Sequence, residues 1–360
     1  MTRVINFNPG PSTLPLAALE RARDEFLDIQ GSGMSIMEHS HRGKLYAAIH
    51  DETIALVREL LQVPDTHHVL FMQGGARAQF ALVPMNLRTD THAGDYIVTG
   101  VWAKGALDEA KVVGKPHVAA DTGKDGKWTR IPRQNELSLS KDAPYVHFTS
   151  NNTVMGTQYF EFPTTGAVPL VCDMSSDLMW RPIDVSKFGL IYAGAQKNLG
   201  PAGVTLVIVR KDLVEKGRTD IPAIFRYGEI AKNNSLQNTI PTFIVYMVRN
   251  VLQTFKARGG LAAIEKDNRR KGEMLYRAID ESRDFYTCPV EKSDRSVMNA
   301  VFRLGSEDAE AKFVKAAEKE GLVGLKGHRS VGGIRVSMYN AMEVSGVERL
   351  VDFMARFQRT

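Results

Sequence analysis

A single lysine between two apolar runs is the feature that most constrains this chain. Residues 190–193 and 204–209 have the length and β-branched content of buried strands, and about ten residues rich in glycine and alanine join them. This connection is short for a helical crossover, so we expect an antiparallel pair. Lys197 lies in the connection, where partial desolvation would lower the pKa of its amine and make it a nucleophile. An ordinary lysine on a surface hairpin is the alternative, and this stretch alone favours neither.

The composition excludes several classes of protein. The chain has 360 residues, 43% hydrophobic and 24% charged, which is ordinary for a globular protein with room for two domains. No apolar run is long enough to cross a membrane and the start has no signal-peptide core, so we expect a cytoplasmic protein. Cys172 and Cys288 suit neither a disulfide framework nor a metal site, and we expect buried thiols. The dispersed net charge of +5 argues against nucleic acid and fits a small anionic substrate.

Apolar periodicity and turn residues predict alternating helices and strands. The first helix is expected to be capped by Ser12 or Thr13 and to reach Gly31. A composition shift after residue 258 predicts a separate α+β domain. Further helices are expected at 45–61, 79–87, 242–255, 261–283, 309–320 and 347–357, and strands at 69–72, 95–99, 146–150, 168–173, 299–304 and 334–339.

Two of the expected strands lead into features that suit a flat, phosphorylated ligand. Gly74-Gly75-Ala76-Arg77 joins a strand to a helix, which is how backbone N–H groups are directed at a phosphate. Trp102 follows the next strand, where an indole could stack on a ring. A tight turn that needs glycine and a tryptophan packed in the core are the alternatives.

Polar residues at other element ends point to the same region. Asp173 ends an apolar strand, and a carboxylate held low in pKa can pair with a protonated pyridine nitrogen. Thr153 follows the strand before it and could reach the same region. Thr239 can cap the helix after Pro241, which gives a second helix start suited to an anion. Plain capping explains Asp173 and Thr239 equally well when each is taken alone.

Histidine and arginine are paired twice, as His41-Arg42 and as His328-Arg329, and Arg335 follows the second pair. Arginine binds carboxylates and phosphates with two parallel hydrogen bonds, although a solvated surface pair is the alternative. With the features above, the chain has the groups that pyridoxal 5'-phosphate requires: an aromatic platform, an acid for the ring nitrogen, a lysine for the aldehyde, and amides for the phosphate.

Five stretches carry a resemblance to a known family. They are Asn6-Phe7-Asn8-Pro9-Gly10-Pro11, Ser40-His41-Arg42, Gly74-Gly75-Ala76-Arg77, Asp173, and Ala193-Gly194-Ala195-Gln196-Lys197-Asn198-Leu199-Gly200-Pro201-Ala202-Gly203. By these the chain resembles the phosphoserine aminotransferases, class-V members of the fold-type-I pyridoxal-phosphate enzymes. The resemblance implies an α/β fold: a large domain with a mostly parallel seven-stranded sheet and a smaller α+β C-terminal domain. It also implies an N-terminal arm (1–15) associated with the small domain, a large domain (16–258) and a small domain (259–360).

The resemblance also implies roles for individual residues. Lys197 would form the Schiff base, Asp173 would bind the ring nitrogen, and Trp102 and Thr153 would contact the ring. No metal is implied, and the protein would be a homodimer whose sites are shared between subunits. The cofactor phosphate would be held by Gly75, Ala76, Arg77 and Gln196 together with Asn238 and Thr239 of the partner subunit; the substrate anions would be held by His41, Arg42, Arg77, His328, Arg329 and Arg335.

The implied reaction moves an amino group between L-glutamate and 3-phosphohydroxypyruvate, giving O-phospho-L-serine and 2-oxoglutarate in serine biosynthesis. A related step in pyridoxine biosynthesis stays open. Two departures from the family pattern are Ala76 and Ala78 in the glycine turn and Asn151-Asn152-Thr153, where glutamate is more usual in the middle. The rivals are an alanine- or serine-type aminotransferase and a noncatalytic binding protein of the same fold. A cysteine desulfurase needs a mobile nucleophilic cysteine and is disfavoured, because Cys172 lies in an apolar strand and Cys288 precedes a proline far from any motif.

Overall fold

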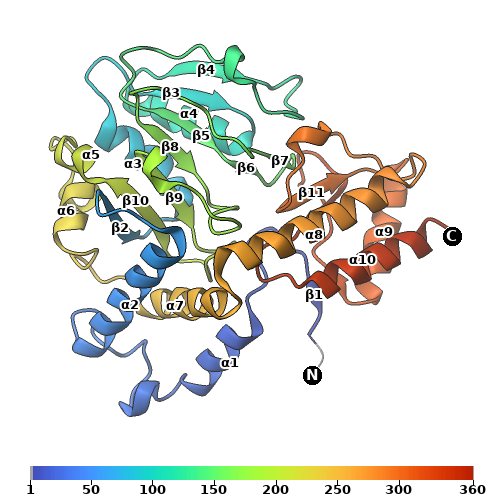
Figure 1. The fold of residues 1–360 in the computed structure, drawn as a ribbon, viewed down its shortest axis with the longest axis horizontal. Helices are drawn as coiled ribbons and strands as arrows, with labels where there is room; N and C mark the ends of the chain where they lie inside the picture. Colours follow the sequence, from blue (N-terminus) through green and yellow to red (C-terminus); the bar gives the residue numbers. More distant parts are fainter. Residues whose placement is uncertain (1–2, 360) are drawn as a thin grey trace.

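A seven-stranded sheet forms the centre of the larger part of the molecule (Figure 1). The structure is a computed structural model that describes residues 3–359, so the first two residues of the expected arm and the last of the expected small domain lie outside the described residues. The strand order is β2 (His67–Met72), β10 (Thr205–Arg210), β9 (Leu190–Gly194), β8 (Leu170–Asp173), β5 (Val146–Thr149), β3 (Asp95–Val98) and β4 (His117–Asp121).

Only β10 runs against its neighbours among these seven strands. It is antiparallel to both β2 and β9, whereas β9, β8, β5, β3 and β4 pair in parallel. The mostly parallel sheet and the antiparallel pair around Lys197 are therefore confirmed. Because the carboxyl ends of parallel strands meet at one edge, the ends of β8 and β9 bring Asp173 and the Lys197 turn to the same side of the sheet.

Alternate residues of β9 face opposite sides of the sheet and enter different apolar clusters. Ile191 packs in a cluster with residues of α2 (Lys44–Leu61) and α7 (Thr242–Ala257). Tyr192 packs in a second cluster with residues of α3 (Gly75–Leu87) and α4 (Val101–Val113). Helices thus cover both faces of the sheet, as a buried parallel sheet requires.

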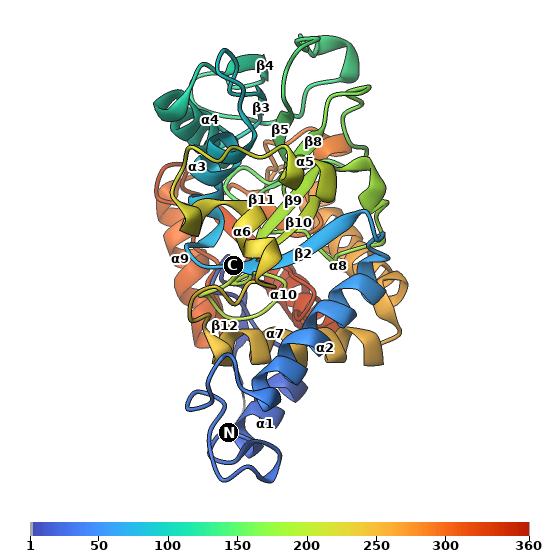
Figure 2. The same cartoon turned by 90° about the vertical axis from the view of Figure 1, so that its left-hand side faces the viewer.

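The C-terminal part forms a smaller α+β unit beside the sheet (Figures 1 and 2). It contains α8 (Gly260–Asp280), β11 (Asn299–Phe302), α9 (Glu307–Lys319), β12 (Leu322–Val323), β13 (Ile334–Ser337) and α10 (Val344–Phe357). β11 pairs antiparallel with β13, and β1 (Ile5–Asn6) pairs in parallel with β12. Phe7 is fully buried in the apolar cluster of this unit, so that the start of the chain is held there.

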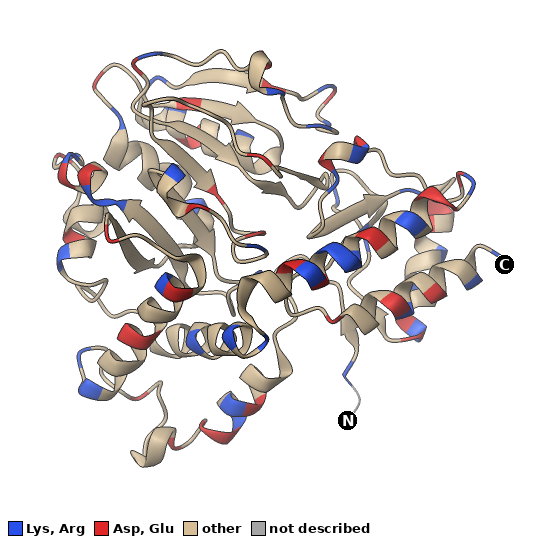
Figure 3. Cartoon of the chain, viewed as in Figure 1, with Lys and Arg blue, Asp and Glu red and all other residues tan. Residues whose placement is uncertain are grey.

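Short elements complete the fold, and none of the helices within residues 3–359 is long and apolar enough to cross a membrane. Lysine, arginine, aspartate and glutamate are dispersed over the surface and alternate in sign along α8 (Figure 3). The short elements are α1 (Leu16–Asp24), α5 (Lys211–Glu215), α6 (Tyr227–Lys232), β6 (Asn151–Asn152), β7 (Thr157–Gln158) and 3₁₀ turns at Ile29–Gly31, Gln134–Glu136, Val185–Lys187, Ala223–Phe225 and Lys292–Asp294.

Both expected side-chain caps are wrong. Helix α1 follows Pro15 without a side-chain cap and ends at Asp24, well before Gly31. Ser12 instead donates its hydroxyl to the carbonyl of Lys197 at 2.6 Å, because the N-terminal arm lies across the lysine turn. Pro241 precedes α7, again without a side-chain cap, so Thr239 does not cap this helix.

The remaining expected elements are present with shifted ends. The helix after the glycine turn begins four residues earlier than expected, since Gly75 already has the first helical position of α3. Cys172 is buried as expected, but Cys288 is only partly buried.

Candidate active site

Lys197 lies in the turn between β9 and β10 and is half-buried. Its Nζ atom is 5.8 Å from the centroid of the Trp102 ring. Across the described part of the chain the amine makes no hydrogen bond and no ion pair. Burial lowers the pKa of this amine, and the negative charge of Asp173 opposes the shift only in part. Lys197 is therefore placed as a reactive amine would be, and not as a lysine on an exposed hairpin.

The N-terminal arm holds the lysine turn from one side. The backbone N–H of Ser12 donates to the carbonyl of Gln196 at 3.0 Å, in addition to the hydroxyl bond to Lys197. Gly10 has a φ of +144°, and a Cβ atom there would lie 3.3 Å from Cγ of Lys197. Sequence reasoning missed these contacts; the only signal was the Pro-Gly-Pro segment, which excludes regular structure without saying where the arm goes.

Asp173 ends β8 and is 5% exposed. Its Oδ1 atom accepts a hydrogen bond from the backbone N–H of Ser175 at 2.9 Å, and it forms no ion pair with any described residue. Burial raises the pKa of Asp173, and the charge of Lys197 offsets only part of the rise. The expected low pKa is thus absent from the protein by itself. A buried carboxylate without a cation is a site that a protonated ring nitrogen would complete, since a positive charge there favours ionisation.

Trp102, Thr153 and Arg335 are joined by hydrogen bonds. The indole Nε1 of Trp102, in the first turn of α4, donates to Oγ1 of Thr153 at 3.0 Å. Arg335, on β13, donates from Nη1 to the carbonyl of Thr153 at 3.1 Å. Arg335 is 8% exposed, and its Nε atom has no partner among the described residues. The structure therefore brings a cation of the smaller unit to the edge of the sheet that holds Trp102 and Lys197.

The glycine turn forms the N-terminus of α3, a helix of 13 residues. Gly74 and Gly75 have φ values of +92° and +67°, and a Cβ at residue 74 would lie 2.6 Å from Cβ of Ala78. Ala76 and Arg77 stand in the first helical turn, whose N–H groups have no side-chain cap. Such a helix start offers unpaired N–H groups to an anion. The side chain of Gln196 folds back onto Gly194, where a Cβ would lie 2.7 Å from its Oε1.

The other predicted binding residues fall into two separate groups. In the turn before β13, His328 is half-buried and its Nδ1 is 2.7 Å from Oγ of Ser330, while Arg329 is exposed. Burial lowers the pKa of His328, and Arg335 lowers it further. This first group faces the same region as Arg335.

The second group is not joined to Lys197 by any hydrogen bond within residues 3–359. Asn238 donates to Oε1 of Gln73 at 2.7 Å, and Gln73 donates to the carbonyl of Thr239 at 2.7 Å. Arg42 is exposed and donates to the carbonyl of Gln237 at 3.4 Å. His41 is 8% exposed, its Nε2 is unpartnered, and burial lowers its pKa.

A second buried acid near Lys197 was missed from the sequence. Asp177 is 5% exposed and accepts hydrogen bonds from Oγ of Ser150 and from Nε2 of Gln158. Burial raises the pKa of Asp177 to about 6. Its only sequence signal is the polar run that follows Asp173. No group of three or more His, Cys, Asp or Glu side chains that could hold a metal occurs in the described chain.

Comparison with known proteins agrees with this geometry. Residues 4–350 match the family described as aminotransferase class-V. The chain is 52% identical over 358 residues to the phosphoserine aminotransferase of Niallia circulans, and 99% of each chain is covered. The structure of phosphoserine aminotransferase from Bacillus circulans subsp. alkalophilus matches with a TM-score of 0.96 at 52% identity over 99% of both chains.

A more distant solved structure agrees as well. The PLP-bound phosphoserine aminotransferase from Trichomonas vaginalis matches with a TM-score of 0.93 at 38% identity, covering 98% of this chain and 100% of that one. The chain therefore belongs to the class-V aminotransferases and, within them, to the phosphoserine aminotransferases.

Proposed function

We propose that this chain transfers the amino group between L-glutamate and 3-phosphohydroxypyruvate, giving O-phospho-L-serine and 2-oxoglutarate, with pyridoxal phosphate bound at Lys197. The observation that carries the proposal is the amine of the half-buried Lys197, which has no hydrogen bond to the described residues and lies 5.8 Å from the Trp102 ring, on the sheet edge where Asp173 ends β8.

The residues of this site fit the cofactor. Pyridoxal phosphate supplies, when bound, an aldehyde that condenses with amines and a ring that draws electrons from the substrate α-carbon. Asp173 would bind the ring nitrogen, Trp102 would cover a ring face, and Thr153 would contact the ring. The phosphate would be held by the first turn of α3, with Gly75, Ala76 and Arg77, and by Gln196.

Lys197 would act as the base and acid of the reaction. Burial lowers the pKa of its amine, which favours the neutral form. Its Nζ would take the proton from the α-carbon of the bound amino acid and give it to the aldehyde carbon of the cofactor. Asp173, ionised beside a cationic ring nitrogen, keeps that nitrogen protonated.

The arginine and histidine residues would bind the substrate anions. Arg335 is buried with an unpartnered Nε, so it can bind a carboxylate through charge-assisted hydrogen bonds. His328 and Arg329 stand in the turn that precedes it and would bind the distal anion, phosphate in one half-reaction and carboxylate in the other. Guanidinium groups suit both anions.

The second group of residues would contribute to a binding site only in a homodimer. Arg42, Asn238 and Thr239 lie beside an apolar cavity of about 480 Å³ bordered by Ile224 and Phe225, whose exposed fractions are 45% and 41%. A contiguous apolar surface of this kind suits a protein interface. In the proposed dimer, His41, Arg42, Asn238 and Thr239 of one subunit complete the site of the other.

Hybrid dimers test the shared site. Lys197→Ala subunits lack the reactive amine, and Thr239→Ala subunits lack a partner contact. If sites are shared, a mixture of the two inactive or impaired variants contains dimers with one intact site and regains activity. A monomeric protein, or a mixture with no gain, would contradict the shared site.

We also propose a division into an arm (1–15), a large domain (16–258) and a small domain (259–360), and a cytoplasmic location. The apolar cluster that holds Phe7 otherwise consists of residues from 275 onward, which supports the association of the arm with the small domain. Both cysteines are unpaired, as is usual in a reducing compartment.

Turnover of phosphoserine tests the function directly. Purified protein incubated with O-phospho-L-serine and 2-oxoglutarate should form glutamate. Good turnover of unphosphorylated alanine or serine without turnover of phosphoserine would favour the alanine- or serine-type rival. The protein should also absorb visible light, and borohydride should fix the cofactor to Lys197 but not to Lys197→Ala. A colourless protein indifferent to the cofactor would favour a binding protein.

A further inference from the structure

A fully buried lysine in the smaller unit uses all three of its donors on backbone carbonyls. Lys271, on α8, is 0% exposed. Its Nζ donates to the carbonyls of Met338, Tyr339 and Met342, each at 2.9 Å. No carboxylate of the described residues forms an ion pair with it. We call residues 338–342, which join β13 to α10, the 338–342 loop.

The geometry requires the ammonium form of Lys271. An ammonium has three N–H donors, whereas a neutral amine has two and a lone pair that would face the third carbonyl. Burial, together with the positive charge of Arg258, lowers the pKa of Lys271 to about 7. Hydrogen bonds to three carbonyl oxygens at 2.9 Å favour the charged form. Burying a charge costs free energy unless hydrogen bonds offset the cost. Here the offsetting hydrogen bonds all come from carbonyls of the 338–342 loop, so they hold this loop in one conformation.

The 338–342 loop contacts the lysine turn directly. The backbone N–H of Asn340 donates to Oδ1 of Asn198 at 3.0 Å, and Asn198 follows Lys197. The side chain of Asn340 donates to the carbonyl of Met179 at 2.9 Å. The loop therefore contacts the lysine turn at Asn198 and a second segment at Met179.

The loop also contacts the N-terminal arm. The hydroxyl of Tyr339 donates to the carbonyl of Pro9 at 2.6 Å and accepts from Nδ2 of Asn299 at 3.1 Å. Pro9 precedes Gly10, which lies against Cγ of Lys197. One loop thus fixes the lysine turn twice, through Asn198 and through the arm.

Helix α8 holds the loop at a second point. Asn268, one turn before Lys271, donates to Oδ1 of Asn340 at 2.8 Å and to the carbonyl of Trp180 at 3.3 Å. We propose that Lys271 is a positioning residue for amino transfer: its ammonium fixes the 338–342 loop, and the loop fixes the lysine turn through Asn198 and Pro9. It touches neither substrate nor cofactor, and the proposal rests on the amino transfer proposed above.

Two variants of Lys271 and one matched control test this. Lys271→Met removes all three donors, and Lys271→Gln keeps two. Ile279→Ala, two turns further along α8, opens a cavity in the core of the same unit and removes no hydrogen bond to the loop. We expect Lys271→Met to lower kcat on the order of 10- to 100-fold with a smaller change in KM, and Lys271→Gln to lie between it and the wild type.

A spectroscopic readout separates positioning from stability. The pH midpoint of the absorption band of the bound cofactor depends on the geometry at Lys197. It should shift in both Lys271 variants and stay unchanged in Ile279→Ala, which should lower only the melting temperature. Asn198→Ala should lower kcat by itself and add little in the Lys271→Met background, because both changes break one chain of contacts.

Each outcome decides the proposal. A Lys271→Met protein with a lower melting temperature but wild-type kcat and absorption midpoint would show a purely structural role. If Lys271→Met does not fold, Lys271→Gln decides by the same measures; if neither folds, the role is structural and the proposal is overturned. Failure of the wild type to turn over phosphoserine would instead refute the proposed function and leave the spectroscopic comparison to judge Lys271.

Discussion

The charged side chains around Lys197 have no charged partner among the described residues. Several surface lysines and arginines are paired, as Lys104 is with Asp108 at 2.6 Å. Asp173 and Arg335 are buried and Lys197 is half-buried, and none of the three forms an ion pair with any described residue. Desolvation is therefore the first cause of each of their pKa shifts. A charged ligand can stabilise the ionised form of a desolvated side chain that has no partner of opposite charge in the protein.

We expect Asp173→Asn to lower kcat on the order of 100- to 1,000-fold, because an amide cannot stabilise a protonated ring nitrogen. The melting temperature should not fall, since the change removes a buried charge whose pKa burial already raises. Steady-state kinetics and thermal unfolding check the two parts. Near wild-type turnover would remove Asp173 from the reaction.

His147 should make stability depend on pH. It is buried in β5 between the rings of Tyr96 and Tyr192, with centroids 5.0 and 6.0 Å away, and its Nε2 is 2.9 Å from the hydroxyl of Tyr192. Burial lowers its pKa from 6.5 to about 3. Between these values the unfolded chain binds the proton and the folded protein does not. Stability is therefore lost as pH falls from 6.5 to 3, by up to about 5 kcal/mol.

Urea unfolding at a series of pH values measures this effect. His147→Phe keeps a ring between the two tyrosines but cannot be protonated. Its unfolding free energy should fall less steeply than that of the wild type between pH 6.5 and 3, even if it is lower at pH 7 because the Tyr192 hydroxyl loses its partner. Equal slopes would assign the acid sensitivity to other groups.

Several active-site residues follow the carboxyl end of a strand in the central sheet. Gly74 follows β2, Trp102 follows β3, and Lys197 follows β9. These strands point the same way, since β2 and β9 are both antiparallel to β10 and β9 belongs to the parallel set. The site is therefore built from strand–turn junctions at one sheet edge, and its precision depends on the conformation of each turn.

The two glycines of the phosphate turn provide a matched pair of substitutions. Both have positive φ, so alanine costs about 1 to 2 kcal/mol at either position. Only at Gly74 does the new Cβ also meet Ala78, at 2.6 Å, whereas residue 75 has open space. We expect Gly74→Ala to lower the melting temperature and cofactor retention more than Gly75→Ala, and Ala78→Gly to restore part of the difference. Equal effects would show that the clash is relieved without moving the turn.

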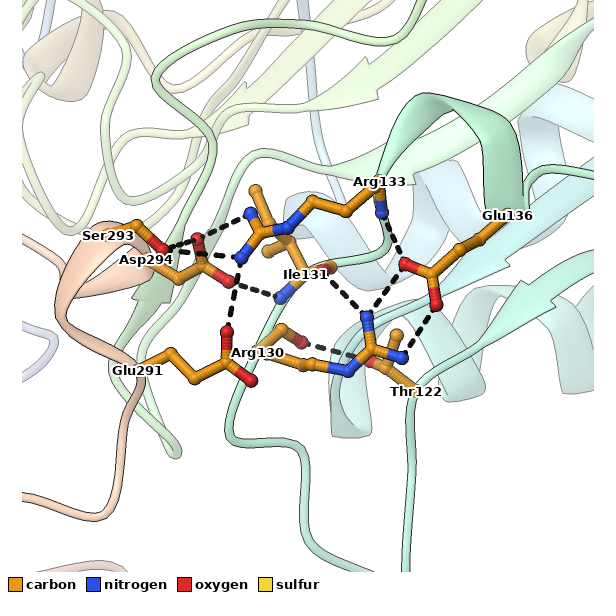
Figure 4. Close-up of polar contacts among 8 residues, drawn as sticks. All are labelled: Thr122, Arg130, Ile131, Arg133, Glu136, Glu291, Ser293 and Asp294. Carbon is orange, nitrogen blue, oxygen red and sulfur yellow. Dashed lines mark hydrogen bonds and ion pairs between the residues drawn. The ribbon is translucent and has the colours of Figure 1, made fainter.

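Polar contacts join the large sheet-containing part to the segment 291–294 of the smaller unit (Figure 4). Arg133 donates from Nη1 to Oδ1 of Asp294 at 2.9 Å, and the backbone N–H of Ile131 donates to Oδ2 at 2.9 Å. Asp294 is 1% exposed. Nearby, Gln158 of β7 accepts from the backbone N–H of Val297 at 3.0 Å. The orientation of the two parts, and hence of Arg335 toward Lys197, depends on these contacts.

Arg133→Gln should destabilise the protein by about 1 to 3 kcal/mol, because the buried carboxylate of Asp294 loses its charged partner. Arg130→Gln is the matched control: its partner Glu136 lies on the same segment and is exposed (Figure 4), so no measurable loss of stability is expected. Chemical denaturation compares the two variants. A loss in Arg130→Gln as large as in Arg133→Gln would contradict the special role of the contact between the two parts.

The sequence by itself predicted the elements that carry the site. The strand pair around Lys197, the glycine turn before α3 and the strand that ends in Asp173 were all readable, because each is encoded by a local pattern of apolar residues and turn formers. Their common location also followed, since the carboxyl ends of parallel strands meet at one edge.

Only the tertiary structure decided which distant side chains surround Lys197. Ser12 binds the lysine turn from 185 residues away. The same residue was expected to cap a helix, which is the local alternative for a serine. The 338–342 loop, held by Lys271, has no local signal at all. The sign of the pKa shift at Asp173 was also missed, because burial and the positions of neighbouring charges depend on how the whole chain packs and not on the residues beside it in sequence.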